Sequence, residues 1–203
     1  MRIKNITFIY TVFILFFVSV VIYSLSLHQR HYIFDSIIAA FFMTIFYRYY
    51  DDLKFDAASF IFIGIGISLH ELGRFGFYGM QFFGINWDIY THTVSSFAMA
   101  VILYNILPGR ISLGRKWVCL IIFLLTIGIA LVGEFIEFSG TIFLKDGQGL
   151  LGLESEAGPF SNVSIDYWDT MSDLAMNAAG GILGILYSVI LRRKVVISPV
   201  IMI

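Results

Sequence analysis

Three aspartates and an asparagine are spaced along one apolar segment so that they share a face of a helix. Asp166, Asp169, Asp173 and Asn177 are separated by steps of three, four and four residues, which places them on one stripe of an α-helix. The segment continues into ILYSVIL and has the length and apolar character of a transmembrane helix. Each carboxylate at the centre of such a helix costs about 2.5–3.5 kcal/mol. Sequences tolerate that cost where the acid faces a polar interior, and such acids usually serve a function.

Other apolar segments carry histidines and carboxylates at comparable depths. His70 lies in GISLHELGRF, Asp88 and His92 are four residues apart in WDIYTH, and Glu134 and Glu137 are three apart in GEFIEF. From a rise of about 1.5 Å per residue, we expect His70, His92, Glu134 and Asp173 within roughly 4–10 Å of the outer membrane boundary. Residues four apart share a helix face, and a histidine and an aspartate on one face can bind a metal or share a proton.

Plainer interpretations exist for several of these residues. Glu71 can pair with Arg74, which also occupies the position of the second histidine of a zinc-protease HExxH motif, so that motif is not present. Asp88 and Asp166 can serve as helix caps. Glu137 can reach water at the helix end, although two glutamates three residues apart seldom both ionise in a low dielectric without a cation or basic partner.

Composition identifies the class of protein. Of the 203 residues, 59% are hydrophobic and only 13% are charged, against about 25% charged in soluble domains. The net charge of −1 suggests no nucleic-acid partner. The single cysteine, Cys119, cannot form an internal disulfide and is interpreted as a buried apolar residue.

The chain is predicted to be an all-α polytopic membrane protein, with residues 1–203 forming one domain. Six segments are long enough to cross a bilayer in a single bundle, and we place them at about 6–27, 31–50, 56–78, 88–107, 117–138 and 166–191. The first follows Arg2 and Lys4 but is longer than the apolar region of a signal peptide, so we interpret it as a retained anchor.

Basic residues predict the orientation. With six spans both termini lie on one side, and that side collects ten of the 13 lysines and arginines: Arg2, Lys4, Arg48, Lys54, Arg110, Arg115, Lys116, Arg192, Arg193 and Lys194. The other side holds Arg30, Arg74 and Lys145. This bias predicts a multi-pass protein of the cell membrane with both termini in the cytoplasm. All four histidines and most acids then lie towards the outer side.

The long outer connection, 139–165, follows the fifth predicted span. It contains five glycines and is long enough to form a lid or a re-entrant segment over the polar groups. Asn162-Val163-Ser164 matches a glycosylation acceptor, a pattern that is common by chance, and the sequence does not decide whether Asn162 is modified.

Several motifs together resemble a known family. WDIYTH, GEFIEF and DYWDTMSDL, in this order and at these separations, resemble the YjdF-like integral membrane proteins of prokaryotes over roughly residues 60 to 190. The resemblance implies a polytopic inner-membrane fold and no established activity. The last segment alone is also similar to the VanZ-like family in Asp173-x3-Asn177-x2-Gly180-x3-Gly184.

Three classes of function remain open. The first is a metal-dependent enzyme that acts on a lipid or polyprenyl substrate, in which Glu134, Asp169 and Asp173 are catalytic. Zinc, iron or manganese would be held by residues drawn from a set of imidazoles and carboxylates: His70, His92, Glu134, Glu137 and Asp173. The second is a small transporter or a cation- or proton-binding protein. The third is a structural membrane protein, and in each case Asp88, Asp166 and Asn177 complete the polar cluster. Membrane lipids are the expected partners, and the sequence does not predict the oligomeric state.

Overall fold

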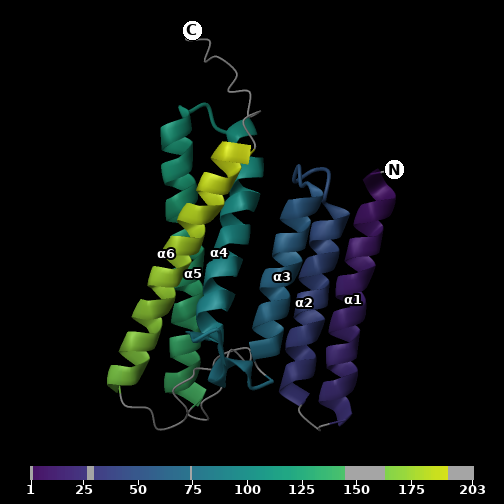
Figure 1. Cartoon of the computed structure of the whole chain (residues 1–203), viewed down its shortest axis with the longest axis vertical. Helices are drawn as coiled ribbons and strands as arrows, with labels where there is room; N and C mark the ends of the chain where they lie inside the picture. Colours follow the sequence, from purple (N-terminus) through teal and green to yellow (C-terminus); the bar gives the residue numbers. More distant parts are fainter. Residues whose placement is uncertain (1, 27–29, 74, 145–162, 192–203) are drawn as a thin grey trace.

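Six long helices account for most of the secondary structure among residues 2–26, 30–73, 75–144 and 163–191, which this computed structural model describes (Figure 1). The helices are α1 (Arg2–Ser26), α2 (Arg30–Arg48), α3 (Ala57–Gly73), α4 (Trp87–Ile106), α5 (Arg115–Leu144) and α6 (Val163–Leu191). Short elements connect them: the 3₁₀ turns η1 (Phe77–Gly79) and η2 (Leu107–Gly109), and the strands β1 (Gln81–Phe82) and β2 (Ile85–Asn86). The predicted all-α class is confirmed.

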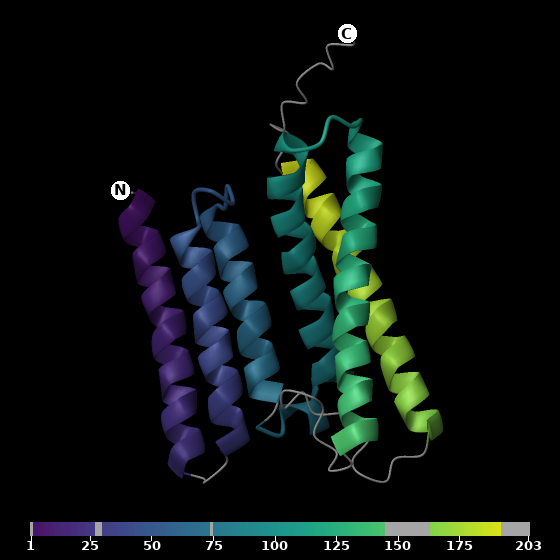
Figure 2. The ribbon, with the colours of Figure 1, turned by 180° about the vertical axis from the view of Figure 1, so that it is seen from behind.

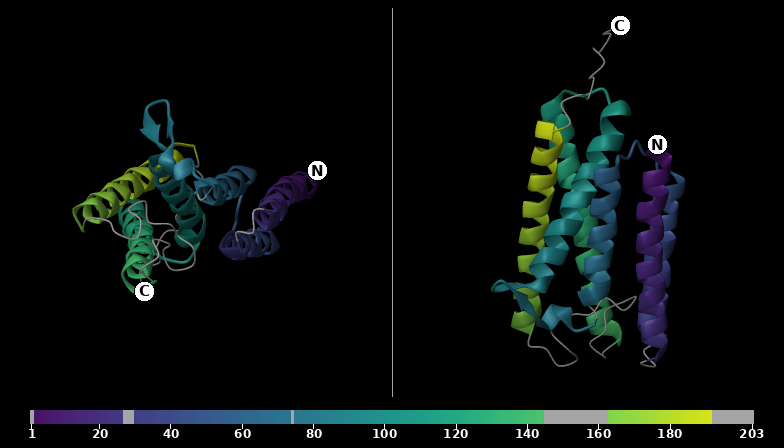
Figure 3. Two further views of the ribbon diagram at one scale, coloured as in Figure 1. Left: turned by 90° about the horizontal axis from the view of Figure 1, so that it is seen from below. Right: turned by 45° about the vertical axis from the view of Figure 1, so that its right-hand side comes forward.

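Helix α4 is central to the bundle. It packs against α3, α5 and α6, and the view from below shows it surrounded by these three helices (Figure 3). Helices α1 and α2 pack against each other beyond α3, so seen from behind the molecule has α1–α3 on one side and α4–α6 on the other (Figure 2). A core of buried apolar side chains, among them Phe17, Met43, Phe60 and Ile102, joins α1 and α2 through α3 to α4.

The third helix is shorter than predicted. It begins after Asp56, whose Oδ1 accepts hydrogen bonds from the Ser59 backbone N–H and hydroxyl and so caps the first turn. It ends at Gly73 rather than near residue 78, because the chain turns back and the Tyr78 ring occupies the space that a Cβ at Gly73 would fill. Gly76 then adopts φ +91°, a left-handed conformation that suits glycine.

A small hairpin that the sequence analysis did not predict follows this turn. Strand β1 pairs antiparallel with β2, and both residues between them, Phe83 and Gly84, have positive φ, as a type I′ hairpin turn requires. The indole N–H of Trp87 donates to the Leu69 carbonyl at 3.0 Å. This bond ties the start of α4 to the end of α3 and so positions the site described below.

The fifth and sixth helices are longer than predicted. Helix α5 continues to Leu144 and α6 begins at Val163, so residues 139–144 and 163–165, assigned to the outer loop, are helical. The helix continues through Gly140, and the apolar residues Ile142, Phe143 and Leu144 form its last turn. The predicted lid or re-entrant segment and Asn162 fall in residues 145–162, outside the described residues.

The surface of the bundle is strongly apolar. Phe8, Leu124 and Phe135 expose 71%, 58% and 69% of their surface, and many other large apolar side chains are also exposed. A soluble monomer rarely exposes so large a contiguous apolar area. Among the described residues, four helical stretches are long and apolar enough to cross a membrane: Asn5–Ser26, Trp87–Ile106, Arg115–Ile136 and Trp168–Leu191. Helix α3 is apolar but has 17 residues, and α2 is less apolar, so a six-span topology stays a prediction.

Candidate functional site

The site is built around His92 on α4. Asp88 lies one helical turn earlier, and its Oδ1 is 3.1 Å from Nε2 of His92. The spacing of four residues places both side chains on the same face of α4. Helix α4 begins at Trp87 with Asn86 in the cap position, so Asp88 lies inside the first turn and its side chain contacts His92.

Helix α6 brings a second aspartate to the same nitrogen. Oδ1 of Asp173 lies 3.7 Å from Nε2 of His92, and Asp173 is only 4% exposed. One ligand atom from each of Asp88, His92 and Asp173 lies within 4.8 Å of the others. Among the described residues this is the group of histidine and acidic side chains with the separation needed to hold a metal ion.

The close packing of α4 on α6 depends on glycine. A Cβ at Gly180 would overlap the carbonyl oxygen of Thr93, and one at Gly184 would overlap that of Phe97. Gly181, on another face of α6, lies against Thr126 of α5. Small residues let the backbones approach, and this approach places Asp173 and Asn177 next to α4.

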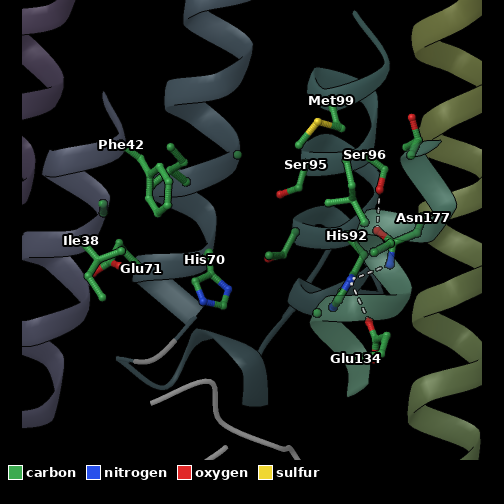
Figure 4. Close-up of a pocket in the computed structure, with 18 of the residues that line it drawn as sticks. Ile38, Phe42, His70, Glu71, His92, Ser95, Ser96, Met99, Glu134 and Asn177 are labelled. Carbon is green, nitrogen blue, oxygen red and sulfur yellow. Dashed lines mark hydrogen bonds and ion pairs between the residues drawn. The ribbon is translucent and has the colours of Figure 1, made fainter. Parts of the chain in front are cut away.

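The other ring nitrogen of His92 has its own partners. Glu134 of α5 is buried, and its Oε1 lies 3.6 Å from Nδ1 of His92. The side-chain amide nitrogen of Asn177 lies 3.1 Å from the same Nδ1, while the Ser96 hydroxyl donates to Oδ1 of Asn177 at 2.6 Å (Figure 4). An amide nitrogen can only donate. Nδ1 therefore accepts, and the proton of the neutral ring lies on Nε2, which faces Asp88 and Asp173.

We call these five residues, Asp88, His92, Glu134, Asp173 and Asn177, the His92 cluster. The cluster borders a cavity of about 400 Å³ that lies between α2 and α3 on one side and α4 and α5 on the other. His92, Glu134 and Asn177 line it directly. Figure 4 shows them on one wall, with His70 and Glu71 on the opposite wall.

That opposite wall has a separate set of hydrogen bonds. Nδ1 of His70 lies 2.9 Å from the Tyr78 hydroxyl, and the buried Ser36 hydroxyl donates to Oε2 of Glu71 at 2.6 Å. His70 and Glu71 follow each other in the sequence, yet both line the cavity. His70 does not belong to the group within 4.8 Å that contains His92.

A family model described as a predicted membrane protein (DUF2238) matches residues 7–194 of the 203. The chain belongs to the DUF2238 family. Membership in DUF2238 fits the resemblance to the YjdF-like proteins, while the similarity of the last helix to the VanZ-like family is not shown. The family match establishes a membrane protein and assigns no activity. No curated protein and no solved structure matches the chain.

The remaining predicted site residues lie in several places. Asp169 is half-buried on α6, one turn before Asp173. Glu137 and Asp166 lie within α5 and α6, but their side chains are outside the described part of the structure, as is Arg74, the proposed partner of Glu71. Their predicted roles stay predictions.

Three residues that the sequence analysis did not single out also shape the site. Asp35 of α2 is buried and lines the cavity, and Ser36 beside it holds Glu71. An aspartate within the largely apolar sequence of α2 could have predicted that this helix also contributes a polar residue to the cavity. Ser96 lies four residues after His92, so the helical period places it on the same face of α4, where its hydroxyl donates to Asn177.

Proposed function

We propose that this protein is a six-span membrane enzyme that binds a divalent metal through Asp88, His92 and Asp173 and acts on a membrane lipid. The observation that carries the proposal is the meeting of these three ligand atoms within 4.8 Å, next to a cavity. Asp173 is buried and His92 is partly buried, with 21% of its side chain exposed. The side chains therefore face the protein interior and not lipid.

The donor set suits a transition metal. One imidazole and two carboxylates are ligands for zinc, iron or manganese. Two carboxylates this close in a desolvated site also require a cation or a shared proton. Three protein ligands would leave coordination positions for water or substrate, as catalytic metal sites do.

The surrounding residues suit metal-assisted chemistry. A bound metal can polarise an acyl or phosphoryl oxygen or activate water. Glu134 lines the cavity from α5 and lies beside the imidazole, so it is placed to move a proton between substrate and solvent. Asp169, one turn from Asp173, is the other acid that we assign to this role.

The arrangement of helix ends supports the six-span topology. Helix α1 begins and α6 ends at the same end of the molecule, where α2 also ends and α5 begins (Figure 1). Arg48 ends α2, and Arg115 and Lys116 begin α5. A cytoplasmic location of this end agrees with the positive-inside rule, and the His92 cluster, near the start of α4, then lies towards the outer side.

Elemental analysis of detergent-purified protein tests the metal. We expect near-stoichiometric zinc, iron or manganese in the wild type. His92→Ala and Asp173→Asn should each lower the affinity for the metal roughly tenfold or more, because each removes a ligand. Asp169→Asn is the matched control: it makes the same change on the same helix one turn away and should retain the metal. Folded wild-type protein that binds none of these metals would reject the proposal.

One observation favours a second candidate, a proton- or cation-binding carrier. In the observed hydrogen-bond pattern the His92 ring proton lies on Nε2 and points at two carboxylates. Chains of this kind form proton relays in membrane proteins. A metal would have to displace this proton, so a folded wild type without metal would favour the carrier.

A further inference from the structure

The cavity beside the His92 cluster has a polar end at the cluster and an apolar part, with Asp35, His70 and Glu71 also in its lining. Thr91, Ser95 and Ser96 line the polar end together with His92 and Glu134. The apolar part is lined by side chains from three helices: Ile38 and Phe42 of α2, Met99 of α4, and Ile129 of α5. Figure 4 shows Ile38, Phe42 and Met99 around the space that His70 and His92 also face.

Two of these lining residues are also largely exposed. Phe42 and Ile129 each expose 47% of their surface, and they lie on different helices, α2 and α5. The stretch of α5 that holds Ile129 is long and apolar enough to cross a membrane. A hydrocarbon chain lying between Phe42 and Ile129 could therefore enter from the bilayer without crossing a polar surface.

Charge restricts what the polar end can accept. Asp88, Glu134 and Asp173 surround one imidazole. A divalent cation would balance only two of these three carboxylates. Within the described part of the chain the cavity lining includes no lysine or arginine. An anionic phosphate head group would meet repulsion here, whereas an uncharged ester or hydroxyl group would find hydrogen-bonding partners.

We propose that this cavity binds a single-chain neutral lipid of the monoacylglycerol class, with its ester and hydroxyl groups at the His92 cluster and its acyl chain between Phe42 and Ile129. A volume of about 400 Å³ lies within the range of small-molecule sites. Any reaction of this lipid rests on the proposed function. Of the two substrate types that the proposed function allows, acyl and phosphoryl, this inference selects the acyl substrate. Binding of the chain itself requires no metal.

Two glycines of α5 provide a matched pair of variants. Gly133 lines the cavity, and a Cβ built there meets no atom within 4 Å. Gly128 on the same helix is equally open but does not line the cavity. Gly133→Leu therefore places a side chain in the cavity without a backbone clash, and Gly128→Leu places the same side chain on the bundle surface.

The test is photo-crosslinking with a diazirine-bearing monoacylglycerol, on chelator-treated protein in detergent micelles. We expect labelling of the wild type and Gly128→Leu, and a loss of roughly tenfold, equivalent to about 1.4 kcal/mol, in Gly133→Leu. Unlabelled monoacylglycerol should compete, and the corresponding lysophosphatidic acid should compete far less. Mapping of the crosslinks by mass spectrometry should place them on α2 and α5 near Phe42 and Ile129.

Three results would overturn the inference: equal labelling of Gly133→Leu and the wild type, stronger competition by the phosphate lipid, or crosslinks confined to the outer face of the bundle. The mapping uses the wild type, so it decides the question even if Gly133→Leu does not fold. The labelling uses metal-free protein, so it is independent of the elemental analysis that tests the proposed function. If the untreated protein binds no metal but the probe labels the cavity, only the proposed function is rejected. If the untreated protein binds metal but the probe does not label the cavity, only this inference is rejected.

Discussion

The imidazole of His92 lies between two pairs of groups with different chemistry. Nε2 faces the carboxylates of Asp88 and Asp173, and Nδ1 faces the amide of Asn177 and the carboxylate of Glu134. Asn177 decides which ring nitrogen carries the proton, because its amide presents either a donor or an acceptor. A hydroxyl both donates and accepts, so Ser96 can hold Asn177 in either orientation. The same residues can therefore surround an Nε2 that carries a proton or an Nε2 that binds a metal.

The residue-scale prediction concerns this proton. In metal-free protein labelled with ¹⁵N-histidine, NMR should show the His92 proton on Nε2, with the signal assigned by its absence from His92→Ala. Ser96→Ala should lower the free energy of unfolding by about 1–2 kcal/mol, because Asn177 Oδ1 loses its buried donor. The neighbouring Ser95→Ala should leave the tautomer unchanged. A proton on Nδ1 in the metal-free wild type would contradict this assignment.

At the scale of elements, the packing of α4 against α6 decides whether the cluster forms. Asp173 and Asn177 are useful only if α6 approaches α4 closely enough for their short side chains to reach His92 and Ser96. Gly180 and Gly184 permit that approach, since both lie against backbone carbonyls of α4. The small-residue face of α6 is therefore a structural requirement of the site.

The element-scale prediction compares two glycine substitutions. Gly180→Ala should destabilise the protein by about 1–3 kcal/mol, because the added methyl group overlaps the Thr93 carbonyl, which cannot rotate away. Gly128→Ala adds a methyl group into open space within α5 and should stabilise it by up to about 1 kcal/mol. Thermal unfolding in detergent measures both. If Gly180→Ala melts at or above Gly128→Ala, the helices do not pack as described.

At the scale of the whole molecule, the polar chemistry lies in one half of an apolar bundle. Helix α3 ends beside the start of α4, and the cavity opens between the two groups of three helices. The six-span topology requires α2 and α3 to cross the bilayer as well. Asp52, between α2 and α3, and Phe83, in the hairpin, then lie on opposite sides of the membrane.

Cysteine labelling measures this topology. In a Cys119→Ser background, Phe83→Cys should react with a membrane-impermeant maleimide on intact cells, because Phe83 is 99% exposed at the hairpin tip. Asp52→Cys, also exposed, should react only after permeabilisation. Labelling of both positions from the same side would show that α3 does not cross.

The sequence by itself determined the membrane class, the number of long helices and the local pairing of Asp88 with His92. These properties depend on composition and on the 3.6-residue helical period, which are readable along the chain. It did not determine the end of α3 at Gly73, because that end depends on Tyr78 folding back over it.

Only the tertiary structure decided which helix faces meet. The sequence placed His70, His92, Glu134 and Asp173 at similar depths. In the structure Asp173 and Glu134 contact His92, whereas His70 lies on the opposite wall of the cavity and pairs with Tyr78. Depth is a property of one helix, whereas contact depends on how each helix is rotated and which neighbour it packs against. In this protein the approach of α6 at Gly180 and Gly184 sets that rotation, and so brings Asp173 to His92.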